Sequence, residues 1–269
     1  MISFFKPYIP IRIKAGLKEL AKYGLQYFLL KRLIGLKYLT LIKMVKINGH
    51  NIKFFVSNKI ELYRTFSYHH KEPLTTNWIL NEHQPGDIFF DIGANVGAYS
   101  LLSALKIGKN GKVYAFEPAA GTFQTLNTNI QINGLTNILA YPLALSNCNE
   151  PVDLKVKSTI PGASGHSIGE ALADGKSFEP VRTQGSFAVT LDDFCQKKNT
   201  CPNHIKIDVD GLENRVLEGM LTTLKNPNLK SILVEIEGSN SKDLLNIFDT
   251  NGFEVQAIEK SNHIFVPKK

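Results

Sequence analysis

Cysteine is scarce in this chain of 269 residues, which contains only Cys148, Cys195 and Cys201. The number is odd, no CxxC pair occurs, and no histidine stands at a zinc-finger spacing. This pattern argues against a disulfide framework and a structural zinc site, and it fits a reducing compartment.

Long hydrophobic runs are absent from the N-terminal segment. Its longest uncharged run after Lys22 is the eight residues 23–30, whereas a membrane-spanning helix needs about 20 apolar residues. No small-residue cleavage site follows this run. We therefore predict a cytoplasmic protein that is not exported.

Acidic residues are almost missing from the first 50 residues, which hold ten Lys or Arg and one acid, Glu19. The net charge of the whole chain is +7, so the remainder is close to neutral. Only Arg12 and Arg32 among these cations are arginines, and no motif of a known reader is present, so we predict no nucleic-acid partner. The lysines accompany an apolar helix pattern, which favours peripheral contact of this segment with the anionic inner surface of a membrane.

Hydrophobic residues make up 43% of the chain and charged residues 20%, which excludes a disordered or fibrous protein. From residue 87 onward, short apolar runs alternate with helical patterns. This alternation is typical of an α/β fold with a mostly parallel sheet and helices on both faces. The expected strands are residues 87–91, 112–116, 137–143, 204–209 and 231–236, followed by an antiparallel hairpin of residues 253–258 and 263–266.

Two regions depart from this rhythm. Residues 146–190 predict a β-rich insertion with a mobile loop, a common place for substrate contacts. Near the N-terminus the sequence predicts a helix over residues 13–38 and a hairpin over residues 45–56. We therefore expect a basic accessory region at 1–75 and an α/β domain at 76–269.

A glycine-bearing loop follows the first strand of the α/β domain. Asp91 ends the strand, and the sequence Gly93-x-x-x-Gly97 leads into a helix. Free helix N–H groups and close backbone approach at glycine favour an anion here. Asn95 replaces the second glycine of the GxGxxG fingerprint, which argues against a dinucleotide.

The second strand ends in Glu117, 24 residues after Gly93. An acid at this place can accept hydrogen bonds from both hydroxyls of a ribose. A ribose that carries an attached carboxylate rather than a pyrophosphate indicates S-adenosylmethionine (SAM). Each feature alone is equally compatible with a tight turn or a solvated strand end, but their order makes coincidence improbable.

Five ordered motifs in this chain resemble those of the FkbM family of SAM-dependent methyltransferases, over roughly residues 80–269. The resemblance implies a seven-stranded class I methyltransferase (Rossmann-like) sheet with an antiparallel strand near its C-terminal end. The five motifs are Asp91-Ile-Gly-Ala-Asn-Val-Gly97, Phe116-Glu-Pro118, Ala144-Leu-Ser146, Thr190-Leu-Asp-Asp-Phe194 and Ile205-Lys-Ile-Asp-Val-Asp-Gly-Leu-Glu213.

The same resemblance implies where the cofactor binds. It assigns the methionine end of SAM to the glycine loop, the ribose to the second motif and the adenine to the third. The cofactor-binding residues expected are Asp91, Gly93, Asn95 and Gly97 in the first motif, Glu117 and Pro118 in the second, and Leu145 and Ser146 in the third. In the last motif the family often carries Glu where this chain has Asp210.

Acids at the carboxyl ends of later strands are the candidates for catalysis, because α/β proteins bind ligands at that edge. They are Asp208, Asp210, Glu235 and Glu237, of which Asp208 and Glu235 are the leading pair. One could be the general base for an acceptor hydroxyl, or both could bind a divalent metal that lowers the pKa of that hydroxyl. The alternative is structural: Asp208 contacts only the SAM ammonium and Glu235 caps a loop.

Two further residues lie near these acids. Lys206 shares a strand face with Asp208 and is expected to pair with an acid there. His166, in the insertion loop, has either a substrate-binding or basic role or is a solvent-exposed loop residue.

These observations predict an enzyme that transfers the methyl group of SAM to an oxygen, namely a hydroxyl of a sugar, glycan or small secondary metabolite. A divalent metal is an optional second cofactor. The alternatives are a nicotinamide-dependent oxidoreductase and a non-catalytic protein that binds a membrane surface.

Overall fold

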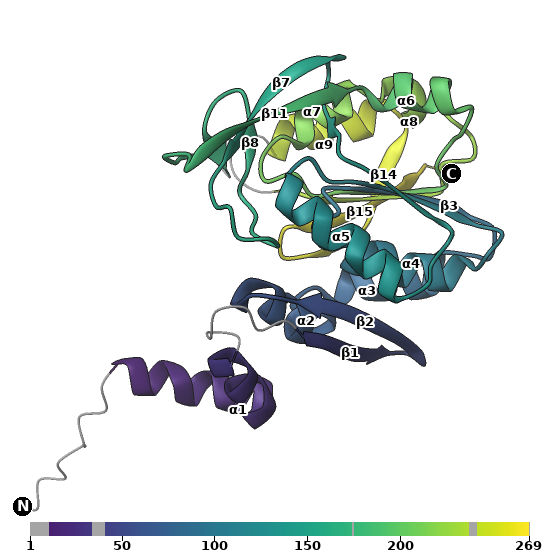
Figure 1. The fold of residues 1–269 in the computed structure, drawn as a ribbon. Coiled ribbons are helices and arrows are strands. Elements are labelled where there is room, and N and C mark those ends of the chain that lie inside the picture. The colour runs from purple at the N-terminus through teal and green to yellow at the C-terminus, as the bar shows by residue number, and fades with distance from the viewer. Residues whose placement is uncertain (1–10, 34–40, 174, 237–240, 269) are drawn as a thin grey trace, which may run out of the picture.

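A computed structural model describes residues 11–33, 41–173, 175–236 and 241–268. Helix α1 (Ile11–Leu33) is interrupted at Gly24, which has φ 79° and ψ 170°. The rest of the helix predicted over residues 13–38 lies outside the described residues. α1 lies beside helix α2 (Lys59–Lys71) (Figure 1). Aromatic rings join the two helices, with Tyr23 against Tyr63 and Tyr27 against Phe66.

Of the helices in the described ranges, none is long and apolar enough to cross a membrane.

The predicted N-terminal hairpin is present as strands β1 (Leu41–Ile47) and β2 (His50–Val56). Its turn is Asn48-Gly49, where φ is 44° and 85°, a conformation that Asn and Gly adopt most easily. The hairpin is fixed to helix α5 (Ala120–Ile132), because Asn129 Oδ1 accepts a hydrogen bond from Phe55 N at 2.7 Å. The boundary near residue 75 stays a prediction.

Helix α2 and helix α3 (Pro73–Glu82) link this hairpin to the main sheet and were not predicted. Asn58 caps α2, because its side chain accepts hydrogen bonds from Ile60 N and Glu61 N. Glu61 Oε2 in turn accepts from Ser57 N at 2.6 Å, so the helix start resembles a capping box. This local signal marks α2 better than its short apolar pattern does.

The central sheet has seven strands in the order β14-β15-β13-β12-β3-β4-β5. β15 runs opposite to the other six strands of this sheet. The expected mixed sheet with an antiparallel C-terminal hairpin is therefore confirmed. The chain order reverses between β3 and β12, and this switch point is where open α/β sheets bind ligands. The strands are β3 (Ile88–Ile92), β4 (Lys112–Phe116), β5 (Ile138–Tyr141), β12 (His204–Ile207), β13 (Ser231–Glu235), β14 (Phe253–Glu259) and β15 (Asn262–Pro267).

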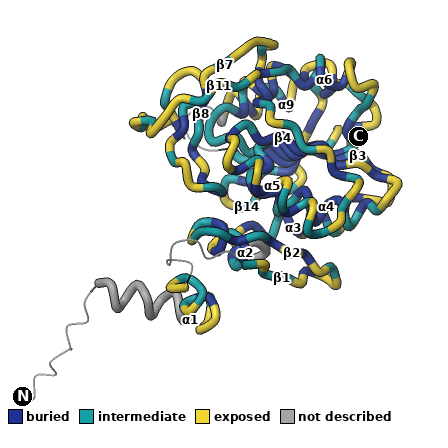
Figure 2. Tube along the Cα trace, viewed as in Figure 1, coloured by how far each residue is buried: buried dark blue, intermediate teal, exposed yellow. Residues whose placement is uncertain are grey.

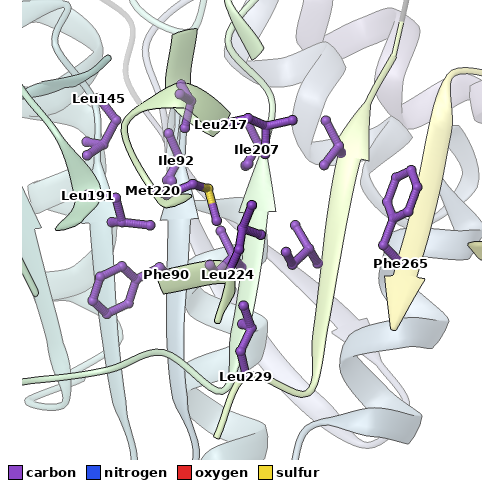
Figure 3. Packing of buried hydrophobic residues seen from close by; sticks show 14 of the residues in the cluster. Phe90, Ile92, Leu145, Leu191, Ile207, Leu217, Met220, Leu224, Leu229 and Phe265 are labelled. Atoms are coloured by element: carbon purple, nitrogen blue, oxygen red, sulfur yellow. The ribbon is translucent and has the colours of Figure 1, made fainter. Parts of the chain in front are cut away.

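Alternating side chains of the sheet form two cores, one on each face, and the sheet is the most buried part of the body (Figure 2). Phe89 packs in the core covered by α3, α4 (Ala98–Ile107) and α5. Its neighbour Phe90 packs in the opposite core, together with Leu191 and Met220 (Figure 3). The helices of this second face are α6 (Leu191–Lys198), α7 (Glu213–Glu218), α8 (Leu221–Leu224) and α9 (Ser241–Thr250).

The segment between β5 and α6 forms a second sheet above the carboxyl ends of the main strands. Its order is β6-β11-β7-β8, and a separate pair of short strands lies beside it. The insertion loop, residues 157–166 between β7 and β8, contacts the glycine loop, residues 93–97, since Asn95 Nδ2 donates to Ala163 O at 3.1 Å. The strands are β6 (Ala144–Leu145), β7 (Glu150–Val156), β8 (Ser167–Ile168), β9 (Leu172–Ala173), β10 (Lys176–Ser177) and β11 (Arg182–Val189).

Candidate active site

The glycine loop between β3 and α4 is held closely to the sheet. Gly93 N and Ala94 N both donate hydrogen bonds to Phe116 O, at 3.0 and 2.9 Å. Gly93 has φ 80°, and a Cβ there would overlap the carbonyl oxygen of Asp208. Gly97, with φ 86°, begins α4, and a Cβ there would overlap the side chain of Leu126. Both positions therefore favour glycine for backbone conformation, and Gly93 also requires it for packing, because the atom it faces belongs to the backbone.

Glu117 lies at the end of β4 with its carboxylate buried beside the glycine loop. Its Oε2 accepts a hydrogen bond from Asn95 N at 3.0 Å, and its Oε1 accepts from Ala119 N at 2.8 Å. Burial raises the pKa of Glu117 to about 7, although these two hydrogen bonds oppose the shift. Each oxygen keeps a further lone pair, so the carboxylate can still accept hydrogen bonds from two hydroxyls.

Asp91 lies below the loop, on the sheet face that α4 covers. Its Oδ2 accepts a hydrogen bond from Ser100 Oγ at 2.6 Å, while the buried Oδ1 has no hydrogen-bond partner among the described residues. Burial raises the pKa of Asp91, and the charge of Lys206 on the neighbouring strand opposes this rise. An unsatisfied buried carboxylate oxygen is an acceptor that an ammonium group can fill.

Three ionisable groups meet at the ends of β12 and β13. Lys206 Nζ lies 2.7 Å from Asp208 Oδ2, so the pairing expected for Lys206 is confirmed. Glu235 hydrogen-bonds to Asp208 and also accepts from Ser261 Oγ at 2.8 Å. Burial and the charge of Asp208 raise the pKa of Glu235 to about 8. Burial favours protonated Asp208 too, but the charge of Lys206 and the Glu235 hydrogen bond hold the Asp208 pKa well below its ordinary value.

These opposite shifts of the two pKa values favour a single proton shared by the acid pair, with Glu235 as the protonated partner. Burial lowers the pKa of Lys206, but the charges of Asp208, Asp91 and Glu72 outweigh it and keep Lys206 protonated. With Lys206 protonated and Asp208 ionised, the Asp208 carboxylate can accept a hydrogen bond or a proton from a bound ligand.

Two adjoining cavities open at this edge of the sheet, and Asp208 lines both of them. The first is lined by Glu117 and by an apolar wall that suits a flat ring. The second lies between α2, the glycine loop and the insertion loop. The residues of the apolar wall are Phe116, Leu143, Leu145, Leu154 and Ile168.

Most of the predicted site residues line the first cavity, and three do not. Asp91 and Ser146 are buried beneath its lining, and Gly97 lies at the start of α4. Ser146 Oγ makes its hydrogen bond to Asn147 Oδ1 at 3.3 Å. The predicted residues that line the first cavity are Gly93, Asn95, Glu117, Pro118, Leu145, Asp208 and Glu235.

Three polar residues near the acid pair form hydrogen bonds to neighbouring backbone N–H groups. Asp210, with φ 55°, accepts a hydrogen bond from Gly165 N at 2.7 Å and so holds the insertion loop. Glu213 Oε1 accepts from Val209 N and Gly211 N, and burial raises the pKa of Glu213 to about 7. His166 is half-buried, lines the first cavity and accepts from Lys157 N at 3.2 Å. The candidate Glu237 lies outside the described residues.

Sequence reasoning missed Arg64 and Lys71, two cations on α2 that line both cavities. Arg64 Nε hydrogen-bonds to Gly162 O of the insertion loop. The signal that could have found them is the capping pattern of Asn58 and Glu61, which predicts a helix here.

The metal alternative rests on two acids. Within the described ranges, no group of three or more His, Cys, Asp or Glu residues is close enough to hold a metal ion. The metal alternative therefore has Asp208 and Glu235 as its protein ligands, and added chelator tests it.

The residues present fit SAM. The apolar wall and Glu117 suit an adenosine, and the unsatisfied acceptor Asp91 Oδ1, buried beneath the cavity lining, suits a nearby ammonium group. The strand order, the glycine loop and the acid after β4 together define a class I SAM-dependent methyltransferase. A family model described as the methyltransferase FkbM domain matches residues 91–258, and the chain belongs to this family. This assignment decides against the nicotinamide alternative.

Two curated relatives carry methyltransferase names. Hexuronic acid methyltransferase AglP of Haloferax volcanii is 26% identical over 207 residues, which cover 75% of this chain and 77% of AglP. Methyltransferase 1 of Beauveria bassiana is 28% identical over 149 residues, which cover 51% of this chain and 59% of that protein. Among solved structures, fibrillarin of Aeropyrum pernix with bound S-adenosyl-L-methionine has a TM-score of 0.47 at 12% identity, covering 88% of this chain and 86% of fibrillarin.

Proposed function

We propose that this methyltransferase modifies a hydroxyl group of a sugar, with Asp208 accepting the hydroxyl proton. The observation that carries the proposal is that Asp208 lines both adjoining cavities. A cofactor in the first cavity and an acceptor in the second would therefore meet at its carboxylate. The name of the relative AglP, a hexuronic acid methyltransferase, supports a sugar as the acceptor.

The cofactor would be held by the groups described above, with the ribose at Glu117 and Pro118, the adenine along Leu145 and the ammonium near Asp91. SAM supplies an electrophilic methyl group on a sulfonium. The protein has to align the acceptor oxygen with that methyl group and remove the hydroxyl proton.

Asp208 is suited to the second task although its pKa is low. An alcohol oxygen becomes strongly acidic as it gains a methyl group, so a weakly basic carboxylate can take its proton late in the reaction. Lys206 keeps Asp208 ionised and oriented, and Glu235 hydrogen-bonds to the same carboxylate. Lys206 and Glu235 act as positioning residues in this account.

The test is methyl transfer from labelled SAM to a panel of sugars, oligosaccharides and non-sugar alcohols. We expect turnover with a sugar and retained turnover in EDTA. Loss of activity in EDTA that Mg²⁺ restores would favour the metal version of the Asp208 and Glu235 pair. Transfer only to non-sugar alcohols would refute the sugar proposal.

A second proposal concerns location: the basic N-terminal region contacts the anionic inner surface of a membrane. It is supported by an exposed leucine stripe on α1, at Leu25, Leu29 and Leu33, which are 61, 50 and 46% exposed. Lys31 and Arg32 lie in the last turn of the same helix. Apolar side chains flanked by cations are typical of helices that lie on anionic lipid.

This proposal is tested by co-sedimentation of the full chain with phosphatidylserine-containing vesicles and with neutral vesicles. Replacing the three leucines of the stripe by serine should reduce binding to anionic vesicles at least tenfold. Equal sedimentation of both proteins would exclude α1 as the contact.

A further inference from the structure

The second cavity has more positive than negative charge in its lining. Four cations line it, and they come from three parts of the chain: α2, the insertion loop and β12. Only two acids, Glu72 and Asp208, are among the lining residues. The four cations are Arg64, Lys71, Lys157 and Lys206.

Both acids are already matched with cations. Lys71 Nζ lies 2.8 Å from Glu72 Oε1, and Tyr99 Oη donates to Glu72 Oε2 at 2.8 Å. Asp208 is matched with Lys206, as described above. Two of the four lining cations are thereby neutralised inside the cavity.

Arg64 and Lys157 are the remaining cations. Within the described part of the chain, no ion pair joins either of them to a carboxylate. The hydrogen bond of Arg64 goes to the neutral carbonyl of Gly162, which orients the guanidinium beside the insertion loop. Lys157 Nζ lies over the ring of Phe178, 5.6 Å from its centroid. Two charges of one sign at one cavity favour an anionic ligand.

We propose that Arg64 and Lys157 form a subsite for a carboxylate on the acceptor, so that the acceptor is an acidic sugar of the uronic acid class. This inference rests on the proposed function and assigns it a substrate class. The carboxylate is bound and is not the group that reacts. In the transfer, the bond from sulfur to methyl carbon breaks as a bond from that carbon to the hydroxyl oxygen forms. The sulfonium becomes a neutral thioether, and the hydroxyl proton goes to Asp208.

The acceptor subsite is distinguished from the cofactor site by the position of its residues. Lys157 lines only the second cavity, whereas Arg64 lines both. Binding of the cofactor carboxylate would therefore depend on Arg64 alone, whereas binding of an acceptor carboxylate would depend on both Arg64 and Lys157.

The experiment compares 4-nitrophenyl β-D-glucuronide, whose C6 is a carboxylate, with 4-nitrophenyl β-D-glucoside, whose C6 is a hydroxymethyl group. Methyl transfer to each is measured with the full chain and with Lys157→Gln, Arg64→Gln and Arg64→Lys. Lys155→Gln is the matched control, because this lysine lies two residues earlier on β7, near Asp153 and outside both cavities. SAM affinity and the unfolding temperature are measured for each variant.

We expect Lys157→Gln and Arg64→Gln each to raise the KM for the glucuronide at least tenfold, the effect of losing one charged hydrogen bond. The KM for the glucoside should change less than threefold, and Arg64→Lys should recover part of the loss. Lys155→Gln should behave like the unmodified protein.

Three outcomes separate this inference from the proposed function. If both glycosides are methylated and the variants affect them equally, the subsite is refuted while sugar methylation stands. If Arg64→Gln weakens SAM binding tenfold and Lys157→Gln changes nothing, the anion at Arg64 belongs to the cofactor. If neither glycoside nor any other sugar is methylated, the proposed function itself fails.

Discussion

Lys206 Nζ and Asp208 Oδ2 lie 2.7 Å apart at the end of β12, and the Lys206 side chain is only 2% exposed. Lys206 also faces Asp91, its direct partner on β3 in the parallel register. One buried lysine therefore connects the acid beneath the glycine loop with the acid at the junction of the two cavities. Removal of either acid would leave the lysine charge only partly compensated.

The first prediction concerns Asp208. Asp208→Asn should lower kcat by about 10²-fold or more, because the amide cannot take the acceptor proton. The dissociation constant for SAM, measured by calorimetry, should change less than threefold. Asp153→Asn, at an acid whose side chain is 67% exposed, is the control and should keep full activity. Equal losses of SAM affinity and turnover would instead assign Asp208 to the cofactor ammonium.

The second prediction is a pH dependence of cofactor binding. Burial raises the pKa of Glu117 to about 7, and only its ionised form accepts hydrogen bonds from two ribose hydroxyls. Between pH 8 and pH 6 the protonated fraction rises, so SAM affinity should fall by about tenfold on account of this group.

Glu117→Gln serves as the reference for that experiment, since it lacks the titrating group. It should bind SAM weakly at pH 8 and show a smaller loss between pH 8 and pH 6. Parallel pH profiles for the two proteins would place the ribose elsewhere.

The third prediction concerns folding stability at Glu235. Burial and the charge of Asp208 raise its folded pKa to about 8 from an ordinary value of 4.5, so the folded chain holds a proton that the unfolded chain loses. This group therefore lowers the free energy of unfolding as pH rises from 4.5 to 8. Glu235→Gln should be about 4 kcal/mol more stable than the unmodified protein at pH 8 and nearly equal at pH 4.5. Urea unfolding at both pH values measures this, and a constant difference would contradict it.

A fourth prediction follows from a buried cluster at the opposite end of the sheet. His204 Nε2 lies 3.1 Å from Asp87 Oδ2, and its Nδ1 lies 2.7 Å from Ser231 Oγ. Burial lowers the pKa of His204 to about 4, although Asp87 opposes the shift. Below pH 6.5 the unfolded chain gains a proton that the folded chain takes up only near pH 4, so His204 makes the fold less stable as pH falls through this range.

The loss in the free energy of unfolding that is due to His204 amounts to about 3 kcal/mol between pH 6.5 and pH 4. His204→Gln should therefore show a flatter fall in the free energy of unfolding over this range. His50→Gln, on the N-terminal hairpin, should follow the unmodified protein. If both variants keep the full slope, the acid sensitivity lies outside this cluster.

The fifth prediction uses two glycines with similar backbone angles. Gly93 has φ 80° and Gly49 has φ 85°, but only at Gly93 would a Cβ meet other atoms. Gly49→Ala should cost about 1 kcal/mol of unfolding free energy, the conformational cost alone. Gly93→Ala should cost at least 2 kcal/mol more and abolish SAM binding, because the glycine loop must move away from Asp208. Equal costs would show that the close approach is absent in solution.

Much of the main sheet could be predicted from the sequence because its strands are buried apolar runs bounded by turn residues. The strand that ends at Asp91 and the strand 112–116 are examples, since Gly86 and Gly111 mark their starts. The N-terminal hairpin followed from Asn48-Gly49. Helix α9 was not predicted, although its core-facing residues Leu244, Ile247 and Phe248 have the spacing of one helix face, which is a sequence signal for a helix.

The cofactor half of the candidate site could be predicted because its residues stand next to one another in sequence motifs. The acceptor half could not, since it is assembled from distant segments. Arg64 on α2 and Lys157 in the insertion come together only through the tertiary fold. The proton distribution between Asp208 and Glu235 likewise depends on burial and on Lys206, which no motif specifies.

The most direct test of the account is product analysis after incubating the protein with SAM and 4-nitrophenyl β-D-glucuronide. We predict one methyl group on a sugar hydroxyl, as an ether that survives alkali, with one S-adenosylhomocysteine formed per product. Asp208→Asn should form this product at least 10²-fold more slowly. A methyl ester that alkali removes, or no methylated sugar, would contradict transfer to a hydroxyl at Asp208.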